Sequence, residues 1–113
     1  LVYTLISAAF GLFPYAAGAD AILAGFADAA ADFGVSALLI PAIDREATPE
    51  AAEVLVEWMI AHRREGIVGL GIDYRETDRP PELFWRAWQA AKRAGFRLMA
   101  HAGEFGCHPR NIR

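Results

Sequence analysis

The sequence has 113 residues, of which 55% are hydrophobic and 22% charged, a balance typical of a folded globular chain with one core and not of a disordered one. Its formal net charge of −3 argues against a protein that grips the nucleic-acid backbone, because that mode of binding requires a basic surface. The single cysteine, Cys107, cannot form a disulfide within the chain, so we expect a reducing compartment, the cytoplasm.

The first predicted strand, VYTLISAAF at residues 2–10, belongs to an apolar stretch that extends over residues 1–24. Glycines and Pro14 interrupt this stretch, Asp20 adds a charge, and no basic residue lies within it. These features argue against a signal peptide or a spanning helix, and we expect no membrane partner. Because no initiator methionine is present, we expect the sequence to begin within a longer protein.

The first predicted helix covers residues 19–34, which are rich in alanine and place apolar side chains at helical spacing. Gly34 follows it, as glycine often does at a helix C-terminus. The second predicted strand is VSALLIPAI at residues 35–43. Short, continuous apolar runs bounded by glycine, proline or charge are typical of strands that are buried on both faces of a parallel sheet.

The second predicted helix covers residues 48–66, with Thr48 as N-cap, Pro49 in the first helical position and Gly66 at the end. IVGLGIDY at residues 67–74 is the third predicted strand. A third helix over residues 80–96 repeats the pattern, and the fourth strand is RLMAHAGE at residues 97–104. The side chains predicted to face inward are Val54, Leu55, Trp58, Met59 and His62 in the second helix, and Leu83, Phe84, Ala87, Trp88 and Ala91 in the third.

Strands and helices therefore alternate, which predicts an α/β fold with a parallel sheet. An open doubly wound sheet and an arc of a (β/α)₈ barrel both fit this order, although no G-x-G-x-x-G motif opens a helix. A complete barrel needs about 250 residues. The 113 residues would supply about half of such a barrel, and both architectures stay open on this pattern alone.

In both architectures, chemistry takes place at the carboxyl ends of the strands. The polar residues predicted to lie there are Asp44, Arg45, Glu46, Asp73, Tyr74, Arg75, Glu76, His101 and Glu104. Acidic residues after strands also cap helices and turn the chain, and we favour this simpler role for Asp44 and Glu46. For Asp73 both interpretations stay open.

His101 follows an apolar strand, where a lone histidine is more often a satisfied core residue than a ligand. Glu104 lies three residues further on, and neutral imidazole beside a carboxylate suits a zinc site with a general acid or base. Catalytic zinc requires about three protein ligands. The other histidines are poor candidates, because His62 is predicted in the last turn of a helix at the wrong end and His108 in a loop.

The motif H-A-G-E at residues 101–104 and the segments around it resemble the adenosine and adenine deaminases of the metal-dependent hydrolase superfamily. DREATPEAAEVLVEWMIAHRREGIVGLGID resembles that family's third strand, third helix and fourth strand. PPELFWRAWQAAKRAGFRLMAHAGEFG resembles its fourth helix and fifth strand, and HPRNIR the start of its fifth helix. Residues 35–113 carry the resemblance, whereas residues 1–34 fit the second strand and helix only by position and pattern.

The resemblance implies a partial (β/α)₈ TIM barrel of four parallel strands, in sequential order, and three helices, with residues 1–113 as a single fragment of a metal-dependent hydrolase barrel. The activity that it implies is that of a zinc-dependent hydrolytic deaminase of adenosine, adenine or a related amino-purine. By position, His101 is implied as a zinc ligand and Glu104 as the catalytic residue that donates a proton to a ring nitrogen of the purine. The family's H-x-H pair is absent from this sequence, so the zinc site is incomplete here. The family's D-L-x-G-x-E also lacks a counterpart, because residues 73–76 read DYRE, so a different amino-heterocycle is an alternative substrate.

Two further hypotheses compete with an enzyme. One is a non-catalytic structural or interaction module, either a decayed barrel or a half-barrel, and the other is a doubly wound binding module without a metal. For the 113 residues in isolation we expect no activity. We also expect a homo-oligomer if they are stable alone, because a partial barrel exposes two sheet edges and an apolar flank.

Overall fold

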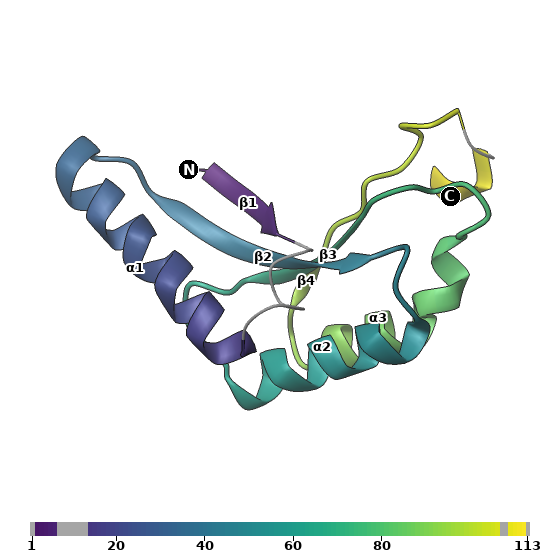
Figure 1. The fold of residues 1–113 in the computed structure, drawn as a ribbon, viewed down its shortest axis with the longest axis horizontal. Coiled ribbons are helices and arrows are strands. Elements are labelled where there is room, and N and C mark those ends of the chain that lie inside the picture. Colours follow the sequence, from purple (N-terminus) through teal and green to yellow (C-terminus); the bar gives the residue numbers. More distant parts are fainter. Residues whose placement is uncertain (1, 7–13, 107–108, 113) are drawn as a thin grey trace.

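Strands and helices alternate along the chain in a computed structural model, which describes residues 2–6, 14–106 and 109–112 (Figure 1). The elements in chain order are β1 (Val2–Ile6), α1 (Tyr15–Phe33), β2 (Ala37–Asp44), α2 (Pro49–Ala61), β3 (Gly69–Asp73), the 3₁₀ helix η2 (Pro81–Phe84), α3 (Trp85–Arg93), β4 (Arg97–Leu98) and the 3₁₀ helix η3 (Pro109–Ile112). Residues 7–10 of the first predicted strand lie outside the described residues.

The four strands form one sheet in the order β1-β2-β3-β4, and every neighbouring pair is parallel. The three α-helices run along the same side of the sheet, as Figure 1 shows. Sequential parallel strands with all crossover helices on one side are the arrangement of a (β/α)₈ barrel arc. The predicted partial barrel is thus confirmed, and the doubly wound alternative is not what these residues form.

Helix α1 begins earlier than the predicted residue 19. Pro14 precedes its first turn and accepts a hydrogen bond from the backbone N–H of Gly18 at 3.1 Å. Tyr15 is 3% exposed, and the centroid of its ring lies 6.3 Å from that of Trp58 in α2. Within the residues that the structure describes, neither α1 nor any other helix is long and apolar enough to cross a membrane.

Helix α2 begins as predicted, because the Thr48 hydroxyl accepts a hydrogen bond from the N–H of Ala51 at 3.2 Å. Its predicted end at Gly66 is wrong, since the helix stops at Ala61. Arg63 and Arg64, which fall within the predicted helix, make tertiary contacts instead. Arg63 donates to the carbonyl of Ala94 at 2.8 Å, and Arg64 donates to the carboxylate of Asp20 at 2.8 Å.

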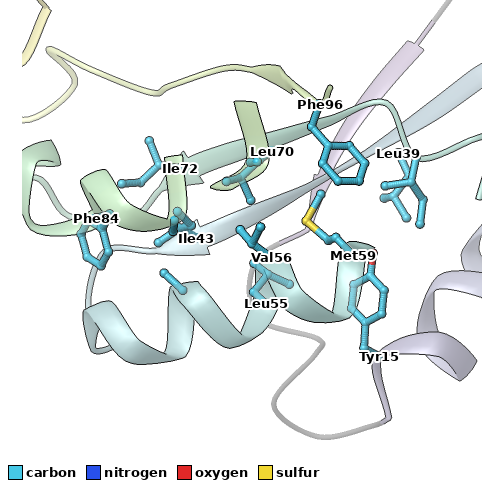
Figure 2. Packing of buried hydrophobic residues seen from close by; sticks show 14 of the residues in the cluster. Tyr15, Leu39, Ile43, Leu55, Val56, Met59, Leu70, Ile72, Phe84 and Phe96 are labelled. Carbon is cyan, nitrogen blue, oxygen red and sulfur yellow. The ribbon is translucent and has the colours of Figure 1, made fainter. Parts of the chain in front are cut away.

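The core lies between the sheet and the three helices (Figure 2). Its fully buried members include Leu39, Ile43, Val56, Met59, Leu70, Ile72 and Phe84. Four residues predicted to face inward are exposed, namely Val54 at 38%, Trp58 at 41%, Leu83 at 39% and His62. Ala52, Leu55, Val56 and Met59 form the buried stripe of α2, so the true inward face is rotated by about one residue from the predicted one.

Candidate active site

The carboxyl ends of β2, β3 and β4 place three predicted site residues in one row. Asp44 and Asp73 are partners in the register of β2 with β3. The ladder between β3 and β4 continues past Leu98, since the N–H of His101 donates to the carbonyl of Ile72 at 3.0 Å. Extending this register puts His101 beside Asp73, and register partners in a parallel sheet point to the same face. These positions agree with the sequence-based prediction.

This row lies on the face of the sheet that points away from the helices. Leu70 and Ile72 belong to the core beneath the helices, so Asp73, which follows in the alternation, points to the other face. In a barrel arc that other face is the interior. The row of Asp44, Asp73 and His101 therefore borders the mouth of the barrel, while the chemical roles of these residues remain predictions.

His101 and Glu104 face each other across a tight turn. The Nδ1 atom of His101 lies 3.8 Å from an Oε atom of Glu104, and their side chains are 42% and 50% exposed. Gly103, between them, has φ of 79°, a conformation that a residue with a Cβ rarely adopts. Both side chains are thus held close together and stay open to an incoming molecule.

Two charged residues beside this pair are buried, a feature that the sequence reasoning missed. Arg45 is 0% and Glu76 is 2% exposed. The guanidinium of Arg45 donates to the carbonyl of His101 at 2.8 Å and to that of Arg79 at 3.0 Å. A carboxylate oxygen of Glu76 accepts a hydrogen bond from the N–H of Glu104 at 3.2 Å. Long-range contacts of this kind cannot be detected from the neighbouring sequence. The one indication of the burial of Arg45 is the alternation of side chains along β2, which turns Arg45 away from the barrel interior.

The loop after β2 is tied to the loop after β3 by a reciprocal contact. Arg79 donates from Nε to the carbonyl of Arg45 at 2.6 Å and from a terminal nitrogen to the carbonyl of Ala47. Asp44 accepts a hydrogen bond from the N–H of Glu46 at 2.7 Å, the turn-forming role favoured for it. The loops that follow β2, β3 and β4 therefore form one connected layer.

The backbone directly after Asp73 is strained. Tyr74 and Asp78 have φ of 69° and 56°, which cost residues other than glycine on the order of 1–3 kcal/mol each. Such conformations persist where surrounding contacts fix them, and they concentrate at functional sites. This loop occupies the position of the D-L-x-G-x-E motif in the family that the sequence resembles. Its backbone reaches positive φ although residues 74–78 contain no glycine.

The described residues meet the needs of a metal only in part. The half-exposed imidazole of His101 has the right chemistry for one zinc position. Residues 2–6, 14–106 and 109–112 contain no group of three or more His, Cys, Asp or Glu side chains that could hold an ion. His62 is exposed beyond the end of α2, where its ring lies 6.4 Å from Tyr15, and His108 lies outside the described residues.

Three titratable groups with shifted pKa values lie at the opposite end of the sheet, namely Tyr15, Asp20 and Arg64. Burial raises the pKa of Tyr15 to about 12. A hydrogen bond from Arg64 lowers the pKa of the Asp20 carboxyl, and the same contact raises that of Arg64. An open hollow of about 400 Å³ lies at this end too, with Arg63, Arg64 and Arg97 in its lining. We do not assign it to the site, because it lies at the amino ends of the strands.

A family model described as adenosine deaminase matches residues 5–112 of this chain. Adenine deaminase from Rhodospirillum rubrum is 37% identical over 91 residues, which cover 77% of this chain and 27% of that protein. Adenine deaminase from Schizosaccharomyces pombe is 40% identical over 94 residues, which cover 77% of this chain and 26% of that protein.

Two solved structures share the fold. A zinc-bound amidohydrolase from Burkholderia ambifaria is 50% identical with a TM-score of 0.93, over 97% of this chain and 31% of that chain. Adenine deaminase from Arthrobacter aurescens is 30% identical with a TM-score of 0.86, over 97% of this chain and 34% of that chain. The chain thus spans about a quarter to a third of the length of these relatives.

Proposed function

This chain belongs to the adenosine deaminase family, and from that premise we propose that the complete protein is a zinc-dependent hydrolytic deaminase of an amino-purine. The single observation that carries the proposal is the pair of His101 and Glu104, 3.8 Å apart and half-exposed at the carboxyl ends of the strands. The residue that would hold the metal and the residue that donates the proton must both lie beside the same small substrate, and this arrangement allows it.

His101 is the proposed metal ligand. Zinc, when bound, would lower the pKa of a water molecule to about 7 and so supply a nucleophile at neutral pH. The imidazole lies at the mouth of the barrel in the row that Asp73 shares, and its backbone N–H is fixed by the carbonyl of Ile72. Further protein ligands, about two of them, come in this proposal from strands beyond the 113 residues.

Glu104 is the proposed acid. Its carboxyl group donates a proton to a ring nitrogen of the purine, which makes the adjacent ring carbon more electrophilic. Water adds its oxygen to that carbon, and the exocyclic amino group leaves as ammonia, so the amino-purine becomes an oxo-purine. The carboxyl must lie within about 3 Å of the ring nitrogen in the bound state. The exposure of Glu104 leaves room for that approach.

The substrate is proposed to be the free base adenine or a close relative. Proteins named adenine deaminase are prominent among the similar sequences and structures. The strained loop after Asp73 is the proposed border of the purine pocket. Because this loop lacks the family's usual glycine, a different amino-heterocycle is the alternative substrate. We propose the cytoplasm as the location because the one cysteine favours a reducing compartment.

For the 113 residues alone we propose no activity, because they supply one ligand where about three are needed. We propose that they form a homo-oligomer if they are stable alone, since β1 and β4 end the sheet with open edges. Interfaces of this kind bury at least about 1,000 Å².

The test is ammonia release by the purified complete protein. Adenine, adenosine and a methylated adenine are supplied in turn, with cytosine as a control for non-specific hydrolysis. We expect ammonia from at least one amino-purine and none from cytosine. A zinc-loaded, folded protein that releases no ammonia from any amino-purine would contradict the proposal and favour the non-catalytic module.

A further inference from the structure

The segment from His101 to Glu104 is anchored at both ends by buried side chains of opposite charge. Arg45, from the end of β2, contacts the backbone of His101, and Glu76, from the loop after β3, contacts the backbone of Glu104. The two anchoring residues are 0% and 2% exposed, whereas the two anchored side chains are 42% and 50% exposed. The anchoring side chains are therefore buried, and the side chains that they anchor are exposed.

The anchor at His101 fixes the peptide plane that follows it. A terminal nitrogen of Arg45 donates to the carbonyl oxygen of His101 at 2.8 Å, while the other terminal nitrogen donates to the carbonyl of Arg79. Arg79 returns a hydrogen bond to the carbonyl of Arg45 at 2.6 Å. The planar guanidinium is thus clamped between two loops, and a charged donor makes hydrogen bonds roughly twice as strong as a neutral one.

The anchor at Glu104 fixes the peptide plane that precedes it. The carboxylate of Glu76 accepts the N–H of Glu104 at 3.2 Å, a contact between residues 28 positions apart in the sequence. Only Ala102 and Gly103 separate the two anchored peptide planes, and Gly103 sets the turn with φ of 79°. Fixing both planes fixes the directions in which the His101 and Glu104 side chains leave the backbone.

We propose that Arg45 and Glu76 are positioning residues, Arg45 for the ligand His101 and Glu76 for the acid Glu104. This inference rests on the proposed function for the roles of the two anchored side chains. Residues one step removed from a ligand commonly cost 10–100-fold in metal affinity or activity when they are changed. Displacement of a reacting group by about 1 Å can cost about 10²-fold in rate.

The experiment uses three variants of the complete protein, Arg45→Lys, Glu76→Ala and Glu76→Gln. Lysine keeps the charge of Arg45 but cannot bridge two carbonyls in a plane. Glutamine keeps an acceptor oxygen at Glu76, whereas alanine removes it. Arg63→Lys is the matched control, because Arg63 also donates to a backbone carbonyl at 2.8 Å, that of Ala94, but at the far end of the sheet.

Three quantities are measured for each variant: amide hydrogen exchange, zinc retention against a chelator, and kcat and KM for the preferred amino-purine. We expect exchange over residues 101–104 to accelerate about tenfold or more in Arg45→Lys and Glu76→Ala, and to change little in α3. Arg45→Lys should lose zinc 10–100-fold more readily. Glu76→Ala should keep zinc and lower kcat about 10²-fold with little change in KM, and Glu76→Gln should fall between it and the unmodified protein.

Amide hydrogen exchange tests the two anchors independently of the turnover of amino-purines. If residues 101–104 exchange at unchanged rates in both Arg45→Lys and Glu76→Ala, the inference is overturned even if the protein is an active deaminase. If the unmodified protein deaminates nothing, the proposed function fails, and accelerated exchange still supports the two anchors. If Glu76→Ala does not fold, Glu76→Gln and Arg45→Lys carry the comparison. Equal losses of zinc and of kcat in the Arg63→Lys control would also overturn the inference.

Discussion

Gly69 lies against the backbone of Arg97 so closely that a Cβ atom at Gly69 would be 2.8 Å from the carbonyl oxygen of Arg97. The two residues are register partners of β3 and β4, so the backbone of the neighbouring strand would have to move. We predict that Gly69→Ala destabilises the complete protein by about 1–3 kcal/mol, as overpacking typically does. Urea unfolding monitored by circular dichroism measures this change.

Gly25→Ala is the control for that substitution. Gly25 lies inside α1, and no heavy atom other than those of its chain neighbours and the helix backbone lies within 4 Å of the position of its Cβ, so alanine meets no obstacle there. Because alanine favours a helix over glycine, we expect Gly25→Ala to stabilise the protein by about 0.5–1 kcal/mol. Similar losses at Gly25 and Gly69 would mean that the close approach of β3 and β4 is not the cause.

The core prediction concerns Met59, which is 0% exposed between α2 and the sheet. We expect Met59→Ala to lower the free energy of unfolding by about 2–5 kcal/mol, because it removes buried apolar atoms and leaves a cavity. Ile60→Ala, one residue along the same helix and 45% exposed in the unmodified chain, should cost much less. Equal losses at the two positions would contradict the described packing of α2.

The ion pair of Asp20 with Arg64 predicts a pH-dependent contribution to stability. Arg64 lowers the pKa of the Asp20 carboxyl, so the folded state holds this proton less tightly than the unfolded state. The contribution is therefore present above the usual pKa of an aspartate and is lost as the pH falls through the lowered value. It should be small, because both side chains are substantially exposed.

Thermal unfolding of Asp20→Asn across pH 2–7 tests this sign. We expect the melting temperature of the variant to be lower at neutral pH and to converge with that of the unmodified protein in acid. Asp28→Asn is the matched control, because Asp28 is exposed on the same helix and makes no ion pair with any described residue. A difference for Asp20→Asn that grows as the pH falls would contradict the prediction.

Hydrophobic pattern and capping residues were enough to predict the order of the elements. Thr48 and Pro49 gave the start of α2 correctly, because an N-cap is a local interaction. The end of α2 was predicted five residues too late, at Gly66, because Arg63 and Arg64 leave the helix to bond with Ala94 and Asp20. Such partners lie far away in the sequence, so no local rule detects them.

The candidate site, too, was predicted from the sequence only in part. The strand ends correctly predicted that Asp73 and His101 would lie together, since parallel strands end at one edge of the sheet. The burial of Arg45 and Glu76 was not predicted, because it depends on how three loops pack over one another. Further ligands for the proposed metal could not be predicted from 113 residues that contain no H-x-H pair.

The metal prediction concerns His101. In the complete protein, we expect His101→Ala to lose zinc and deaminase activity together, because about three ligands are needed to hold a catalytic zinc. His62→Ala is the control, since His62 lies beyond the end of α2 at the opposite end of the sheet. Metal analysis and ammonia release are measured on the same preparations. Retention of zinc by His101→Ala at the level of His62→Ala would remove the ligand assignment.

The central claim, that Glu104 is the acid of a deaminase, is tested most directly by the turnover of Glu104→Gln in the complete protein. The amide keeps the shape of the side chain but cannot donate the acid proton, so we predict full zinc content and a kcat reduced about 10²–10⁴-fold. Ammonia release from saturating amino-purine, with zinc measured in the same samples, gives the answer. Unchanged turnover of every amino-purine by a zinc-loaded Glu104→Gln protein would contradict the claim.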